Sequence, residues 1–159
     1  MIVKLKVNGE IRSADVPPET TLLKLLREHL SLTGAKLGCD VGDCGTCTVI
    51  VDGESVNSCL MLAGRASGRE VTTIEGLASS EQLHPLQEKF EELGALQCGF
   101  CGPGMIISAK ALLDKNPEPT VFEVRDALSG NLCRCTGYTK IIEAVLDAGR
   151  IMSTAEAKS

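Results

Sequence analysis

The sequence predicts an α+β protein of two small domains, in which strands around one helix precede a unit of four helices. Three observations lead to this prediction. Up to about residue 75, apolar and polar residues alternate over short stretches that end in Asn-Gly or Asp-Gly turns. After residue 84, apolar residues recur with helical spacing. Between these parts, residues 77–83 are rich in the small and polar residues typical of a linker.

The first part is expected to contain five short strands and one helix. Asn-Gly at residues 8–9 and Asp-Gly at residues 52–53 favour hairpins, because these residues accept positive φ. Thr20 or Thr21 is expected to cap the helix, whose leucines form a broad apolar stripe. The expected strands cover residues 2–7, 11–16, 46–51, 54–58 and 71–74, and the expected helix covers residues 22–30.

The second part is expected to be helical throughout. Thr120 is a suitable cap for the third helix of this part, and Gly130-Asn131 is expected to end it as a C-cap. The four expected helices cover residues 85–93, 104–115, 120–128 and 138–152.

Composition excludes several classes of function. The chain of 159 residues is 43% hydrophobic, so it has enough apolar material for a core, and its formal net charge is −5. An acidic chain without a Lys/Arg run lacks the electrostatic footprint of a protein that binds nucleic acid or anionic membranes. No apolar run reaches the roughly 20 residues that span a bilayer. The N-terminal residues form a strand pattern instead of a signal peptide, so a cytoplasmic location is expected.

Cysteine is the unusual residue of this chain, with 8 in 159. In a reducing compartment such a number favours metal ligands over disulfides. Neither of the two histidines, His29 and His84, is close in sequence to a cysteine, so an all-sulfur site is expected. The cysteines divide evenly into a first quartet, Cys39, Cys44, Cys47 and Cys59, and a second quartet, Cys98, Cys101, Cys133 and Cys135.

The first quartet has the C-x4-C-x2-C spacing of plant-type 2Fe–2S loops. Such a loop wraps the cluster, points its sulfurs inward and donates backbone N–H groups to them. Gly38 directly precedes the first ligand, Gly42 and Gly45 lie between ligands, and these glycines permit the close approach and unusual φ that such a loop requires. Cys59, one hairpin later, completes the site.

The second quartet indicates a different construction. Cys98 and Cys101 lie at or just before the start of one expected helix, and Cys133 and Cys135 just before another. Helix N-termini present free N–H groups and favour thiolates, so two helices aimed at one point would suit an anionic 2Fe–2S cluster. Four-thiolate zinc sites that only stabilise the domains, and disulfides, remain as alternatives at this stage.

Four motifs carry a family resemblance that spans roughly residues 2–152. They are LTGAKLGCD at residues 32–40, GDCGTCT at 42–48, QCGFC at 97–101 and GNLCRCTGY at 130–138. In this order and spacing the sequence resembles the small iron–sulfur subunits of molybdenum hydroxylases, the group of xanthine dehydrogenase, aldehyde oxidoreductase, aerobic carbon monoxide dehydrogenase, nicotinate dehydrogenase and 4-hydroxybenzoyl-CoA reductase.

The resemblance implies a specific architecture. A β-grasp, ferredoxin-like domain would occupy residues 1–76, a linker residues 77–83, and an all-α four-helix domain residues 84–155, with one 2Fe–2S cluster in each domain. The first quartet would hold the cluster nearer the flavin, and the second quartet the cluster nearer the molybdopterin. Gln97 and Cys135 would approach the pterin.

The same resemblance implies partners and a role. A large subunit would bind molybdopterin, a medium subunit would bind FAD, and the assembly would be a dimer of heterotrimers. This chain would relay single electrons between those cofactors. One departure is visible, because Gly102 follows Cys101 where the family usually has Thr, which leaves the local rigidity and the cluster potential open.

Two other functions compete with this interpretation. The chain could act as a stand-alone two-cluster ferredoxin-like carrier, which would be a redox-active monomer. It could also be a zinc-stabilised adaptor, which would contain zinc and no inorganic sulfide.

Overall fold

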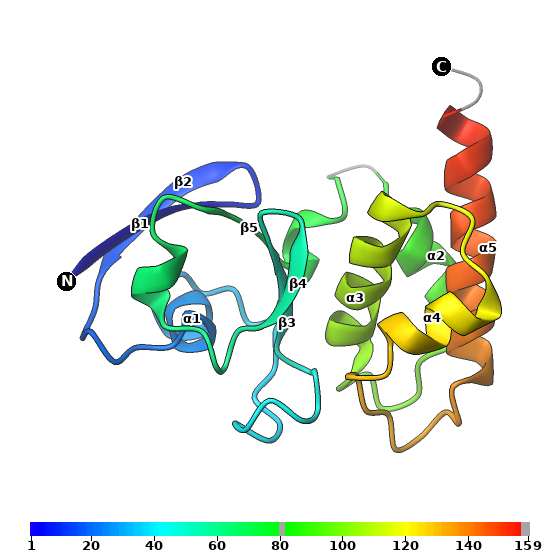
Figure 1. Ribbon diagram of the computed structural model, residues 1–159, viewed down its shortest axis with the longest axis horizontal. Coiled ribbons are helices and arrows are strands. Elements are labelled where there is room, and N and C mark those ends of the chain that lie inside the picture. The colour runs from blue at the N-terminus through cyan, green and yellow to red at the C-terminus, as the bar shows by residue number, and fades with distance from the viewer. Residues whose placement is uncertain (80–81, 157–159) are drawn as a thin grey trace.

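The computed structural model describes residues 1–79 and 82–156 and shows a strand-rich unit beside a helical unit (Figure 1). The first unit holds a five-stranded sheet in the order β2-β1-β5-β3-β4. β1 and β5 are parallel, and the other neighbours are antiparallel. The strands are β1 (Ile2–Val7), β2 (Glu10–Asp15), β3 (Thr48–Val51), β4 (Glu54–Asn57) and β5 (Glu70–Thr72).

One helix packs against this sheet and completes the expected β-grasp arrangement. It begins as α1 (Leu22–Lys24) and continues as a π-helical turn, η1 (Leu25–His29), in which the Leu30 N–H donates to the Leu25 carbonyl. The alternating side chains of β1 point into the same core as the helix leucines. That core includes Val3, Leu5, Val7, Leu22, Leu25 and Leu26.

The local predictions for this unit are largely confirmed. Both expected hairpin turns form, with φ of +50° and +85° at Asn8 and Gly9. Thr21, not Thr20, caps the helix by accepting a hydrogen bond from the Lys24 N–H. Four expected strands differ in their bounds: β2 and β4 each end one residue earlier than expected, and β3 and β5 differ more. β3 begins two residues later because a turn occupies residues 46–47, and β5 ends at Thr72 because the Thr73 N–H donates to the Asn8 side chain.

The second unit is a ring of four helices, each packed against two others. α2 (Pro85–Glu92) contacts α3 (Gly102–Lys115) and α5 (Thr139–Glu156), and α4 (Val121–Ala127) closes the ring between α3 and α5. Phe90, Met105 and Ile141 are fully buried at its centre. Thr120 caps α4 as expected, whereas α4 ends at Ala127, so the prediction that Gly130-Asn131 forms its C-cap is wrong.

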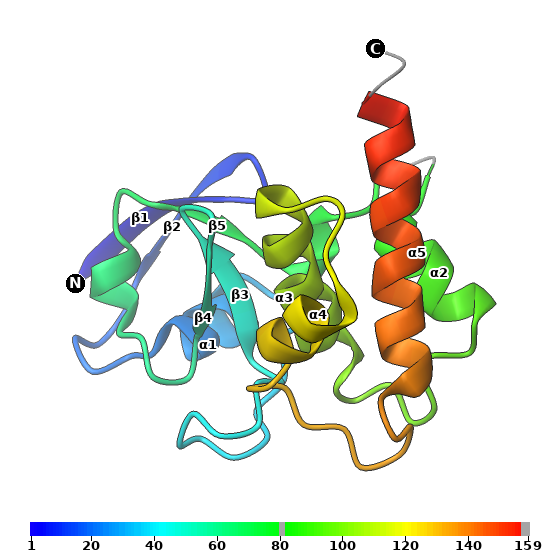
Figure 2. The ribbon, with the colours of Figure 1, turned by 45° about the vertical axis from the view of Figure 1, so that its right-hand side comes forward.

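The two units share an apolar contact. Ile50 of β3 packs with Ile107 and Ala111 of α3, while the neighbouring Val49 and Val51 point to the opposite face of the sheet. β3 is therefore buried along its whole length, and α3 lies beside it in both ribbon views (Figures 1 and 2). Leu77 joins this contact, so the first residue of the expected linker packs against the junction; residues 80 and 81 of that linker lie outside the described residues.

Within residues 1–79 and 82–156, no helix is both long and apolar enough to cross a membrane.

Candidate metal centres

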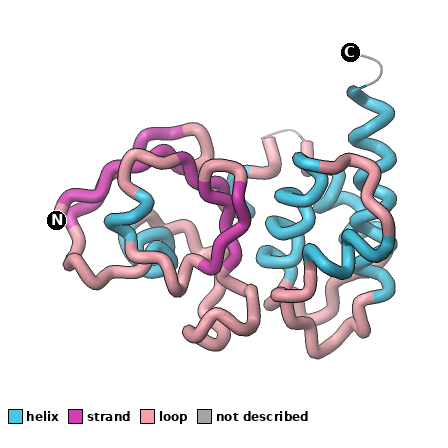
Figure 3. Tube along the Cα trace, viewed as in Figure 1, coloured by secondary structure: helices cyan, strands magenta, loops and turns pink. Residues whose placement is uncertain are grey.

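The loops that carry the cysteines gather along one edge of the molecule. In the view of Figure 3, the loop before β3 and the loops before α3 and α5 lie together at the bottom, away from both termini. The two quartets come from different units, and the junction between the units brings their loops side by side. All eight cysteines are unbridged thiols.

The first quartet combines buried and accessible sulfurs. Cys47 and Cys59 are buried against the sheet core, whereas Cys39 and Cys44 are partly exposed in the glycine-rich loop. Three backbone N–H groups converge on the Cys39 sulfur, from Val41 at 3.5 Å, Asp43 at 3.3 Å and Cys44 at 3.4 Å. The loop therefore donates to sulfur as the sequence predicts.

These surroundings give the thiols of the first quartet different acidities. The N–H groups of Val41 and Cys44 lower the pKa of Cys39 to about 7, because they stabilise the thiolate. Burial, followed by the neighbouring Cys47 thiol, raises the pKa of Cys59 to about 12. Assembly of a metal centre here would release protons, because cysteines bind metals as thiolates.

The second quartet lies in two loops of the helical unit. Cys101 is the N-cap residue of α3, but burial and the nearby Cys133 thiol raise its pKa to about 12, so desolvation outweighs the helix terminus. Burial also opposes ionisation of Cys133, yet the Thr136 hydroxyl at 3.1 Å and the N–H groups of Cys135 and Thr136 hold its pKa below the usual value. At Cys133 the donors are therefore loop groups and not the N-terminus of α5, which begins at Thr139.

The exposed members of this quartet lie together. The Cys135 thiol donates to the Cys98 sulfur at 3.6 Å, an interaction that raises the pKa of Cys135. Cys98 and Cys135 are both exposed, and so is Gln97, which directly precedes Cys98. Gln97 and Cys135, the two residues that the resemblance places toward the pterin, are therefore both exposed, and Cys98 lies beside them.

The thiols associate in pairs, which is the pattern that a two-iron cluster needs. The pairs are Cys39 with Cys44, Cys47 with Cys59, Cys98 with Cys135, and Cys101 with Cys133. In each quartet the two pairs also interact electrostatically with one another. In the described part of the chain, no three His, Cys, Asp or Glu side chains group around a single metal-ion position. With its thiols in two pairs, each quartet fits a 2Fe–2S cluster, in which two thiolates bind each iron.

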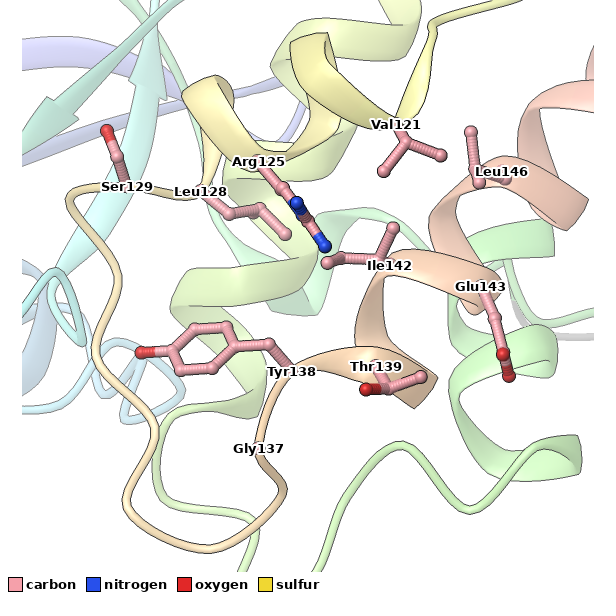
Figure 4. Close-up of a pocket in the computed structure, with 10 residues that line it drawn as sticks. All are labelled: Val121, Arg125, Leu128, Ser129, Gly137, Tyr138, Thr139, Ile142, Glu143 and Leu146. Atoms are coloured by element: carbon pink, nitrogen blue, oxygen red, sulfur yellow. The ribbon is translucent and has the colours of Figure 1, made fainter.

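A cavity of about 400 Å³ connects the two quartets. Its wall includes Cys44 from the first quartet and all four cysteines of the second, with Phe100 and Leu132 between them. Tyr138 borders this cavity and also a separate groove between α4 and α5, of about 450 Å³, which contains no cysteine (Figure 4). Tyr138 is therefore common to the sulfur-lined space and to that groove.

Known protein families match both units in the expected order. The family model described as "2Fe-2S iron-sulfur cluster binding domain" matches residues 5–74, and the one described as "[2Fe-2S] binding domain" matches residues 73–146. Over 143 residues the chain is 54% identical to the nicotinate dehydrogenase small FeS subunit of Eubacterium barkeri. The aligned residues make up 90% of this chain and 91% of that subunit. The chain belongs to the family of small iron–sulfur subunits of molybdenum hydroxylases.

Solved structures of this family have the same fold. Quinoline 2-oxidoreductase from Pseudomonas putida 86 matches with a TM-score of 0.94 and 44% identity, covering 100% of this chain and 98% of that chain. The aldehyde oxidoreductase of Desulfovibrio desulfuricans matches with a TM-score of 0.93 and 47% identity over 96% of this chain, but over only 17% of that one. This iron–sulfur subunit thus corresponds to a separate chain in one relative and to part of a longer chain in the other.

Sequence reasoning missed the polar residues that support the ligands in this small subunit. The Tyr138 hydroxyl accepts a hydrogen bond from the Cys133 N–H, and the Thr46 and Thr136 hydroxyls lie 3.2 Å and 3.1 Å from the Cys44 and Cys133 sulfurs. All three lie within or beside the cysteine motifs, yet only the folded loops show which sulfur or amide each contacts.

Proposed function

We propose that this subunit relays single electrons between a molybdopterin site on a large partner subunit and FAD on a medium partner subunit. One observation supports this most strongly: Cys44 of the first quartet and all four cysteines of the second border one cavity at the domain junction. When bound, a 2Fe–2S cluster accepts and releases one electron at a time. Two sites in series would divide the electron pair that substrate oxidation releases at molybdenum.

The proposal assigns a direction to each site. The second quartet would face the pterin, because Gln97, Cys98 and Cys135 are exposed beside one another. The first quartet would face the flavin, with Cys39 and Cys44 at the accessible side of their loop. Domains at residues 1–76 and 84–155, a linker at 77–83, assembly as a dimer of heterotrimers and a cytoplasmic location belong to the same proposal.

The chain's own residues hold and insulate the sites. All eight cysteines would be ligands, the N–H groups around Cys39 and the Thr136 hydroxyl beside Cys133 would stabilise thiolate charge, and buried Cys47 and Cys59 would exclude water. Substrate choice would lie with the partner subunit. The relatives named above act on nicotinate, quinoline and aldehydes according to their names, while this unit keeps its fold.

Composition of the native complex tests the proposal. We would purify it without air through an affinity tag on this chain and measure iron, acid-labile sulfide, zinc, molybdenum and FAD. The relay predicts about four irons and about four sulfides per copy of this chain, together with molybdenum and FAD. A redox-active monomer without partners would favour the stand-alone carrier, and about two zinc ions without sulfide would favour the zinc adaptor.

A further inference from the structure

A single hydrogen bond joins the main chains of the two cysteine quartets. The Leu132 N–H donates to the carbonyl of Cys44, a member of the first quartet, at 2.9 Å. Leu132 directly precedes Cys133, a member of the second quartet. A connection through bonds from Cys44 to Cys133 therefore crosses between the domains at this hydrogen bond.

The neighbouring residue, Asn131, anchors this contact from the helical domain. Its side chain is buried, with 5% of the residue exposed. Its Nδ2 atom donates to the Gly45 carbonyl at 3.0 Å and to the Thr48 hydroxyl oxygen at 3.3 Å. The Thr48 hydroxyl in turn donates to the Gly45 carbonyl at 2.6 Å, so both domains converge on one carbonyl in the first cysteine loop.

Glycines allow the two backbones to approach this closely. A Cβ on Gly45, whose φ is +69°, would lie 2.3 Å from the Gly130 carbonyl oxygen. A Cβ on Gly104, in the first turn of α3, would lie 2.3 Å from the Gly45 carbonyl oxygen. No side chain fits at either position without separating the domains, and Figure 2 shows the segment after α4 crossing the lower end of β3.

The segment is also fixed from the side of the second quartet. The Tyr138 hydroxyl donates to the Asn131 carbonyl at 3.1 Å and accepts from the Cys133 N–H at 2.8 Å. Residues 131–133 thus form hydrogen bonds with Cys44 and Gly45 in the first cysteine loop and with Tyr138 beside the second quartet. A segment held from both sides keeps a constant geometry.

We infer that Asn131 is a positioning residue that holds the Cys44 carbonyl on the Leu132 N–H and thereby sets the separation and coupling of the two cluster sites. This inference rests on the proposed function. Passage of one electron from one site to the other makes and breaks no bond in the chain and moves no proton. Its rate then depends on the distance and the contact between the sites, which Asn131 keeps fixed.

Electron paramagnetic resonance of the dithionite-reduced native complex tests the inference. With both clusters reduced in the unaltered chain, we expect two signals that are split by their magnetic interaction. Asn131→Ala is expected to retain both signals at full integrated intensity and to lose this splitting. Thr48→Val should change the splitting in the same direction, and Thr48→Ser, which keeps the hydroxyl, should restore it. Asn116→Ala, at the far end of α3, is the matched control and should leave the splitting unchanged.

Gly104→Ala provides a second route if Asn131→Ala does not fold. Its Cβ would act as a wedge against the Gly45 carbonyl, and we expect altered splitting with both clusters present. Unaltered splitting in folded Asn131→Ala or Gly104→Ala protein would overturn the inference, as would two unsplit signals in the unaltered chain. These results would leave the relay standing, whereas the absence of both signals from the unaltered complex would overturn the relay itself.

Discussion

The Tyr138 hydroxyl accepts a 2.8 Å hydrogen bond from the backbone N–H of Cys133, five residues earlier in the chain. This contact closes the loop that carries Cys133 and Cys135 just before α5 begins. Tyr138 adopts a φ of +71°, a left-handed conformation that is uncommon for a residue with a side chain. The two hydrogen bonds of the hydroxyl hold Tyr138 in this conformation.

Removing that hydroxyl should weaken the second site selectively. In Tyr138→Phe the Cys133 N–H and the Asn131 carbonyl lose a partner, at a cost of about 1–3 kcal/mol in the free energy of unfolding of the loop. We expect heating to destroy the cluster of the second quartet sooner than in the unaltered protein, which is measured as a faster loss of its paramagnetic signal. The signal of the first quartet is an internal control in the same sample, and equal decay of both signals would contradict the prediction.

The division of ligands into quartets can be tested by a matched pair of substitutions. Cys133→Ser should abolish the paramagnetic signal of the second site and retain that of the first, because the two sites share no cysteine. Cys47→Ser should produce the reverse pattern, since Cys47 pairs with Cys59 in the first site. Survival of both signals at normal intensity in either variant would show that the ligand sets are assigned incorrectly.

Much of this fold follows from local sequence signals. The Asn8-Gly9 and Asp52-Gly53 turns, the Thr21 and Thr120 caps and the helical period after residue 84 depend on near neighbours, and each is observed. Element ends were predicted less well, because long-range contacts decide them. β5 ends where Asn8, from a hairpin 65 residues away, binds Thr73, and such a partner has no signature in the local sequence.

For the candidate sites, the sequence predicts which cysteines belong together but not the contacts that support them. Cysteine number and spacing predict both quartets, since an all-cysteine 2Fe–2S cluster takes four thiolates. Gly130-Asn131 has the sequence of a C-cap, yet α4 ends earlier and Asn131 reaches the other domain. Its partner Gly45 lies 86 residues away, so only the packed domains could reveal this role.

His84 makes stability depend on pH. It caps α2, since its Nδ1 accepts the Leu86 N–H at 3.2 Å and its own N–H donates to Gln87. Burial, and then the charge of Lys110 on α3, lower the pKa of His84 from its ordinary value of 6.5, while Asp114 opposes them. The unfolded chain therefore binds this proton more readily than the folded one. Stability should fall as the pH drops below about 6.5 and level off below the lowered pKa.

A cap that does not titrate should remove this dependence. We expect His84→Asn to keep the N-cap and to flatten the change in thermal unfolding midpoint between pH 7.5 and the acidic side of that window. His29→Asn is the control, because His29 is exposed at the end of the first helix and the slope should persist. An unchanged slope in His84→Asn would assign the pH dependence to other groups.

Space beside Cys44 should limit what can replace Gly38. A Cβ at this position would lie 2.7 Å from the Cys44 sulfur and 2.8 Å from the Thr46 hydroxyl oxygen, closer than such contacts occur. Because φ of Gly38 is outside the left-handed region, alanine carries no backbone penalty there, and any effect of Gly38→Ala reports the contact itself. We expect lower iron and sulfide content and loss of the first signal, with the second signal retained. Gly130→Ala, whose Cβ meets no atom within 4 Å, should keep both signals, and equal cluster content in the two variants would show that the first loop yields to the added methyl group.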